Sequence, residues 1–175
     1  MGWFNVLKGA YPSLQQIDKT HDVAPGQSGI VRGSLIYEDG TTFKLATAAI
    51  KQDASKYVFF ALQGQDDLVA GMAGSVGQGV GGGTSRVTGL AIGMPFEFQT
   101  DQFKGDETYN VGDLLTTGNN GKLAPHANGD NVIAQVTKVP FVRWVNDAVA
   151  VTGFRTGANV AVLSGRTMWI PRYTV

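Results

Sequence analysis

The chain has 175 residues, a length that fits one domain, and its low charged fraction of 16% and 24 glycines are typical of turn-rich β structure. Its 14 basic and 14 acidic side chains cancel, so no net field attracts polyanions and we expect no nucleic-acid partner. It has no cysteine, which excludes disulfides, zinc–thiolate sites, iron–sulfur clusters and thiol nucleophiles.

The hydropathy pattern argues against a membrane protein. No stretch reaches the roughly 18 to 20 consecutive apolar residues that a membrane-spanning helix needs, so we expect no membrane partner. The first 16 residues, MGWFNVLKGAYPSLQQ, lack a long apolar core and a small-residue cleavage site, so we expect no signal peptide. Val6 stands where a myristoylation motif after Met1-Gly2 would need Ser or Thr.

Residues 1–29 differ from the rest of the chain and are predicted to form an extended N-terminal arm. The large apolar residues of this segment are Trp3, Phe4, Leu7, Tyr11 and Leu14. Their spacing would place them on one side of a helical segment, but Pro12 interrupts that segment. There are two alternatives, because so many exposed apolar groups would be unfavourable. Either these side chains fold back over the domain's own core, or the arm lies on a partner. Residues 21–29 are predicted to be a flexible connection.

Residues 30–175 are predicted to form one β-domain. β-forming residues at 33–38, the pair Asp39-Gly40 and alternation at 42–45 predict a hairpin, since glycine accepts the positive φ of tight turns. Residues 47–55 are compatible with one short helix. The apolar run at 57–62 predicts a strand buried on both faces.

Residues 64–85 hold the densest glycine and are predicted to form a long loop that is either mobile or ordered only by a neighbouring molecule, because fixing a glycine backbone costs much entropy. The run GQGVGG at 77–82 matches the dinucleotide-binding pattern G-x-G-x-x-G. Residues 84–89 are rich in β-branched side chains and broken by glycine, whereas the motif requires a helix there. Gly83 stands where a P-loop requires lysine. We therefore expect no nucleotide cofactor.

From Arg86 onward the sequence predicts short strands separated by turns about every 8 to 12 residues, a pattern typical of an antiparallel sandwich or barrel. Phe96 and Phe98 should share one face, with Glu97 on the other. The predicted strands cover residues 86–92, 95–99, 114–116, 122–124, 132–139, 141–145, 148–152, 158–163 and 168–175. The fold class is therefore all-β, an antiparallel sandwich or barrel with an N-terminal arm.

Few residues could carry chemistry. His21 and His126 lie in predicted loops without metal-ligand spacing, so we expect solvated side chains and no metal. Acidic residues at 66–67 and 101–107 could serve glycoside hydrolysis, but acidic turns occur in most β-proteins. No G-x-S-x-G nucleophile motif is present. We therefore expect that the protein is not an enzyme, that it has no catalytic residue and that it binds no cofactor.

Residues 103–136 contain YNVGDLLTTGNNGKLAP and, further on, GDNVIAQV. This segment resembles a module of turns and strands that is common in tailed-phage virion proteins, with the pattern VGD-LLT-GxxGKL-P-A-GD-VI-xV. The pattern recurs in capsid decoration proteins, also called cement or head-stabilising proteins, which are encoded near the major capsid protein. Similar hairpins occur in tail and baseplate proteins. The match includes neither the arm nor the glycine-rich loop.

The resemblance implies a non-enzymatic virion protein, made in the bacterial host cytoplasm, that sits on the capsid exterior and bridges major capsid protein subunits. Its partners would be that protein and copies of itself, with a homotrimer favoured and a dimer possible. The predicted capsid or subunit contacts are Trp3, Phe4, Leu7 and Tyr11. A chain lacking residues 1–14 is expected to fold without binding heads.

The alternative is a carbohydrate- or receptor-binding module of a phage tail, spike or baseplate. Aromatic residues with polar groups could stack on sugars, although most of them fall on predicted strands, where core packing also explains them. These residues are Trp3, Trp144, Trp169, Tyr37, Tyr57, Tyr109 and Tyr173.

Overall fold

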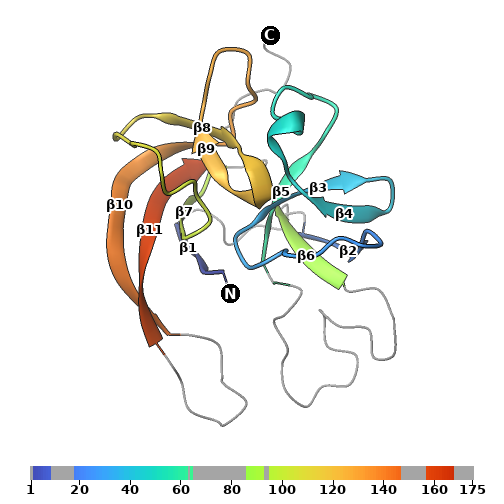
Figure 1. Ribbon diagram of the computed structural model, residues 1–175, viewed down its shortest axis with the longest axis horizontal. Helices are drawn as coiled ribbons and strands as arrows, with labels where there is room; N and C mark the ends of the chain where they lie inside the picture. The colour runs from blue at the N-terminus through green and yellow to red at the C-terminus, as the bar shows by residue number, and fades with distance from the viewer. Residues whose placement is uncertain are drawn as a thin grey trace.

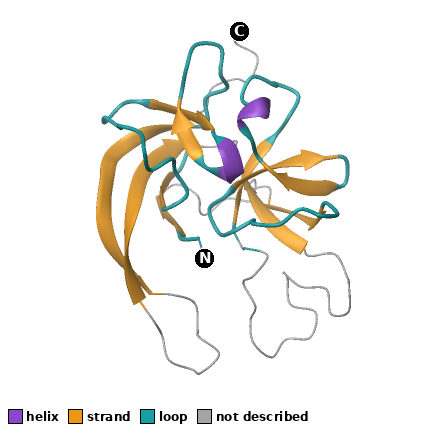
Figure 2. Ribbon diagram, in the orientation of Figure 1, coloured by secondary structure: helices purple, strands orange, loops and turns teal. Residues whose placement is uncertain are grey.

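The structure is a computed structural model that describes residues 2–8, 18–62, 64, 86–92, 95–146 and 157–167. Over these residues the protein is all-β, as the sequence predicted, and contains two sheets (Figures 1 and 2). The helical elements in the described ranges are two short 3-10 turns, η1 (Ala48–Ile50) and η2 (Asn119–Gly121). No helix of the described residues is long and apolar enough to span a bilayer.

The first sheet is antiparallel and has six strands in the order β1-β7-β11-β10-β8-β9. Its two longest strands, β10 and β11, pair from Ala134 with Thr167 to Asn146 with Gly157. They form a curved ribbon that extends to one side of the molecule (Figure 1). The strand bounds are β1 Phe4–Lys8, β7 Glu97–Thr100, β8 Leu114–Thr117, β9 Leu123–Pro125, β10 Ala134–Asn146 and β11 Gly157–Thr167.

The second sheet is a closed barrel of five strands in the order β2-β4-β3-β5-β6. Neighbouring strands are antiparallel except β2 and β4, which run parallel. Closing the sheet removes the free edges that could otherwise pair with other chains. The bounds are β2 Asp18–Val23, β3 Leu35–Asp39, β4 Thr42–Leu45, β5 Val58–Ala61 and β6 Arg86–Ala91.

Local sequence signals in the barrel are confirmed. β3 and β4 form the hairpin predicted from Asp39-Gly40, and Gly40 has a φ of +65°, which glycine adopts without a steric penalty. β5 is buried along its whole length, as its apolar run predicted. Of the helix predicted over residues 47–55, only Ala48–Ile50 is helical, as a 3-10 turn.

One hydrophobic core joins the barrel to the six-stranded sheet. Phe60 on β5 meets Phe4 on β1 and Phe98 on β7, with ring centroids 4.9 and 4.8 Å apart. Leu35 of the barrel and Leu163 of the sheet belong to the same cluster, and both are fully buried. A second cluster takes the alternate positions of the barrel strands and includes Phe43 and Phe59.

The described part of residues 1–29 is built into the domain and does not form a separate arm. β1 pairs with β7, and β2 pairs with β4 and β6 in the barrel. Phe4 is only 8% exposed, so the first alternative holds for it: its ring covers the domain's own core. Deleting residues 1–14 would uncover Phe60 and Phe98, so we expect this deletion to be destabilising, contrary to the sequence-based expectation.

The sequence predicted that Pro140 separates two strands, but the structure has one continuous strand there. β10 continues through it, and the register with β11 shifts between Val136 and Lys138 and again between Lys138 and Phe141. Proline has no N–H for the ladder, and at a bulge one residue lies outside the regular pairing. Because of the bulge, β10 is one bent strand and not the two strands that the sequence predicted.

Several predicted features lie outside the described residues. They are the glycine-rich loop over 64–85 apart from Gly64 at its start, the strands at 148–152 and 168–175, and the contact residue Tyr11.

Candidate interaction surface

The β10–β11 ribbon extends beyond the hydrophobic core, so the core-facing side of the sheet continues past the buried residues. Phe98 points into the core from β7 and pairs with Gly165 on β11, so Gly165 lies on the core-facing side. Side chains alternate along a strand, so Leu163 and Ala161 share that side. Ala161 pairs with Val142, which places Val142 on the same face of β10.

This face changes from buried to exposed along the ribbon. Leu163 is fully buried, whereas Val142 is 70% and Trp144 60% exposed. Trp144 pairs with Asn159, and both Asn159 and Ala161 are exposed. We call the four residues Val142, Trp144, Asn159 and Ala161 the overhang face. It is a continuation of the core-facing side of the sheet for which the described part of the barrel provides no cover.

The opposite side of the ribbon is tied to the N-terminus. Arg143 donates a hydrogen bond to Oε1 of Gln99, and its guanidinium lies 5.1 Å from the ring centre of Trp3. The backbone N–H of Trp3 donates to Asp101 Oδ1 at 2.8 Å. These contacts hold Trp3 partly buried against β7 and β10, since a cation over an indole face is attracted by the ring.

The structure does not bring the four predicted contact residues together on one surface. Phe4 is a core residue, and Trp3 lies under Arg143. Leu7 is 42% exposed and lies at an irregularity in the pairing of β1 with β7. Tyr11 is outside the described residues. Among the described ones, Leu7 is thus the predicted contact whose side chain is most accessible.

Sequence reasoning missed the overhang face, because it assigned strand aromatics such as Trp144 to core packing. A signal was present. In the run FVRWV at 141–145, apolar residues occupy both alternating positions of a strand. A strand buried on one face would carry polar residues on the other, so the pattern requires cover on both faces. Only the tertiary structure shows which face lacks it.

The two histidines tested for chemistry make structural contacts, and the acidic pair at 66–67 lies outside the described residues. His21 lies in β2, not in a loop as predicted, and its Nε2 is 2.8 Å from Oε1 of Glu38. Lys19 donates to the same carboxylate at 2.8 Å. Burial alone would raise the pKa of Glu38, but the hydrogen bonds from Lys19 and His21 outweigh burial and lower it. His126 Nε2 lies 2.9 Å from the carbonyl oxygen of Asp130.

Residues 103–136 contain β8, η2, β9 and the start of β10. Polar side chains stabilise the turns of this segment through hydrogen bonds. Asp113 accepts a hydrogen bond from the N–H of Asn110 at 2.7 Å, and the Tyr109 hydroxyl donates to the carbonyl of Lys104 at 2.8 Å. Burial, with the charge of Glu107 adding to it, raises the pKa of Tyr109 to about 12. The motif residues therefore shape the backbone of this segment.

Comparisons of the chain with protein-family models, with curated proteins and with solved structures found no match. In the described part of the chain, no group of three or more His, Asp or Glu side chains is arranged to hold a metal ion. The exposed large apolar side chains among the described residues are Leu7, Val111, Val139, Val142 and Trp144. Val142 and Trp144 are the pair that shares one strand face.

Proposed function

We propose that the protein is a structural virion protein of a tailed phage that binds the outside of the assembled capsid and stabilises it by bridging major capsid protein subunits. The overhang face carries the proposal, because an exposed tryptophan beside an exposed valine on a projecting ribbon favours contact with another protein surface. The resemblance of residues 103–136 to capsid decoration proteins supports the capsid as that surface.

A small contact face is compatible with this role. The area of one tryptophan and one valine contributes only a few kcal/mol at about 25 cal/mol per Å². Many copies on one lattice, or several faces in one oligomer, multiply such contacts through effective concentration. A protein that binds the assembled lattice and not free subunits shifts the equilibrium away from subunit loss. We expect a homotrimer, with a dimer as the alternative.

Heads that lack the protein provide the test. We expect the full chain to sediment with such heads, and Trp144→Ser to weaken this binding by about tenfold or more, because a central aromatic contact is lost. Val111→Ser is the matched control, since Val111 is 67% exposed on a turn outside the overhang face. It should bind like the wild type. Both variants should retain the wild-type melting temperature.

Two outcomes would contradict the proposal. Failure of the wild-type chain to sediment with heads would remove the capsid role. Equal loss of binding in both variants would remove the role of the overhang face. Binding of the isolated chain to a glycan array, abolished by Trp144→Ser, would instead support the carbohydrate-binding alternative.

A further inference from the structure

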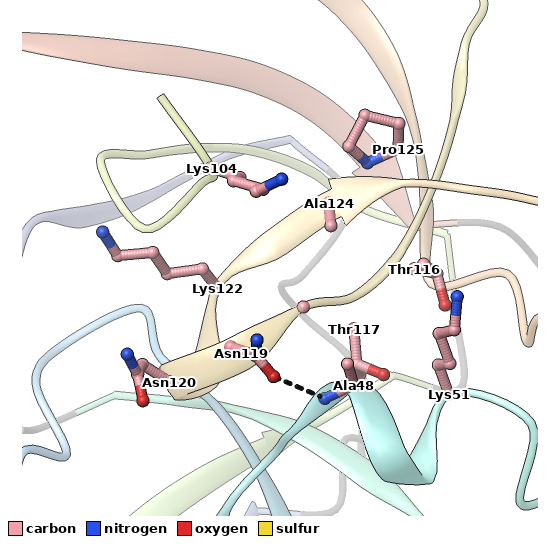
Figure 3. A pocket seen from close by; sticks show the side chains of 11 residues that line it. Ala48, Lys51, Lys104, Thr116, Thr117, Asn119, Asn120, Lys122, Ala124 and Pro125 are labelled. Atoms are coloured by element: carbon pink, nitrogen blue, oxygen red, sulfur yellow. Dashed lines mark hydrogen bonds between the residues drawn. The ribbon is translucent and has the colours of Figure 1, made fainter. Parts of the chain in front are cut away.

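A pocket of about 320 Å³ opens between η1 and the hairpin made by β8, η2 and β9 (Figure 3). Its size lies at the lower end of the range of about 300 to 1,000 Å³ that ligand pockets span, which suits a small group. Lys51, Lys104 and Lys122 line it together with threonine and asparagine side chains, and no aspartate or glutamate is among the described lining residues. A lining of donors without carboxylates favours a negatively charged ligand.

Two buried hydroxyls in the pocket wall have unused hydrogen-bonding capacity. Thr116 is 1% and Thr117 2% exposed, and neither Oγ1 makes a hydrogen bond with any described residue. Both residues line the pocket, and in Figure 3 both hydroxyls point toward the side chain of Lys51. An unpaired buried hydroxyl is unfavourable, so a ligand oxygen that accepts from it would gain more than at an exposed site.

The three lysines differ in how far their charge is neutralised. Lys51 donates to Asp130 at 3.1 Å, and Lys104 is paired with Glu107. Lys122 is exposed and forms no ion pair with a described residue. In Figure 3 the Lys122 side chain points away from Thr116 and Thr117, so Lys122 contributes an uncompensated positive charge at the rim of the pocket. The other two ammonium groups retain N–H groups for further hydrogen bonds.

The pocket walls are held by backbone contacts between the hairpin and the barrel. The N–H of Ala48 donates to Asn119 Oδ1 at 3.3 Å, shown as a dashed line in Figure 3, and the N–H of Gly121 donates to the carbonyl of Ala46 at 2.8 Å. Gly121 has a φ of +67°, and a Cβ there would lie 2.5 Å from Leu45 Cδ2. Such a fixed wall lowers the entropy cost of binding.

We propose that this pocket binds a small oxyanion of the carboxylate or phosphate type. Lys122 supplies an attracting charge at the rim, and Lys51 lies on the side of the two hydroxyls (Figure 3). The hydroxyls of Thr116 and Thr117, which make no hydrogen bond with a described residue in the free protein, donate to the oxyanion. The oxyanion could be a free ion in solution or the carboxylate of an acidic side chain on a neighbouring subunit. The site is separate from the overhang face and does not depend on the proposed function.

Titration of the isolated full chain with sodium phosphate and with sodium acetate, followed by NMR, tests the proposal. We expect saturable shifts of the backbone amides of residues 116–122, with sodium chloride at the same ionic strength as the reference. Thr117→Val keeps the shape of the side chain and removes its hydroxyl. It should weaken anion binding by about tenfold, the effect of one hydrogen bond to a charged group.

The same variant separates a binding role from a structural one. Because Thr117→Val removes a hydroxyl that has no partner among the described residues, the melting temperature of the free protein should stay the same or rise, while anion affinity falls. Lys122→Gln should also weaken binding. Lys138→Gln, which removes an exposed charge on β10 outside the pocket, should not.

Shifts equal to those in chloride, or unchanged affinity in both Thr117→Val and Lys122→Gln, would overturn the proposal. Comparable binding of acetate and phosphate would support it and indicate carboxylate chemistry of the kind an acidic side chain offers. Preference for phosphate would support it and indicate a free or ligand-borne phosphate. The titration needs no heads, so its failure would leave the proposed capsid function untouched.

Discussion

At the scale of single residues, Asp130 joins the turn at residues 127–130 to Lys51 and Gln52. Its buried carboxylate accepts from Lys51 Nζ at 3.1 Å, from the N–H of Ala127 at 3.0 Å and from Gln52 Nε2 at 3.1 Å. Burial alone would raise the pKa of Asp130, but these donors together outweigh burial and hold the pKa below its ordinary value of 3.8. The carboxylate thus stabilises the fold in its charged form.

The lowered pKa predicts how Asp130→Asn will behave. At neutral pH the variant should lose about 1 to 3 kcal/mol of unfolding free energy, because an amide cannot accept from all three donors. The wild type has this contribution in full above pH 3.8 and loses it as the pH falls through the lowered pKa, so the difference should shrink there. Urea unfolding at a series of pH values measures it.

Asp106→Asn provides the control for that experiment. Asp106 has a side chain 75% exposed and lies 3.8 Å from Lys104, so its removal should change stability little at any pH. A difference between wild type and Asp130→Asn that stays constant with pH would contradict the electrostatic explanation.

At the scale of elements, β1 has one buried and one exposed side. Phe4 points inward onto Phe60 and Phe98, whereas Leu7 points outward at an irregular position of the pairing. The strand therefore completes the core and also leaves an apolar side chain exposed. Its core role has no local signal, because Phe4 pairs with Thr100, far away in the sequence.

Two alanine variants of β1 separate these roles. Phe4→Ala should lower the unfolding free energy by about 3 to 5 kcal/mol, because it leaves a cavity between the two sheets. Leu7→Ala should change it by less than about 0.5 kcal/mol, as is usual for exposed positions. Guanidinium unfolding checks both values. Equal small effects would show that the ring of Phe4 does not pack in the core.

At the scale of the whole molecule, the two sheets share one core. The cluster that contains Leu35, Val58 and Phe60 from the barrel also contains Leu115 and Leu163 from the six-stranded sheet. Neither sheet can lose its structure without exposing apolar side chains of the other. The architecture therefore favours one cooperative unit over two independently stable parts.

This shared core predicts a single unfolding transition. Tryptophan fluorescence, to which Trp3 and Trp144 contribute from the side of the six-stranded sheet, should give the same guanidinium midpoint as the NMR signals of barrel amides in β3 and β5. Two separate midpoints would contradict it, and would mean that the barrel remains folded when the sheet does not, or the reverse.

Much of the local structure could be predicted from the sequence, because turns and short strands depend on neighbouring residues. Asp39-Gly40 predicted the β3–β4 hairpin, and the strands predicted over residues 114–116 and 122–124 correspond to β8 and β9, which pair with each other. The strand boundary predicted at Pro140 was wrong, because a proline ends a strand only where the partner strand does not accommodate a bulge. That condition is set by β11, not by the residues around Pro140.

Composition and turn spacing by themselves determined that the protein is all-β, with one hairpin at Asp39-Gly40. The tertiary structure decided that residues 4–8 complete the core, that the ribbon leaves Trp144 exposed, and that Thr116 and Thr117 line a pocket with three lysines. The physical reason is distance along the chain. Burial and pockets arise from strands that pair across many residues, and local sequence patterns do not specify those partners.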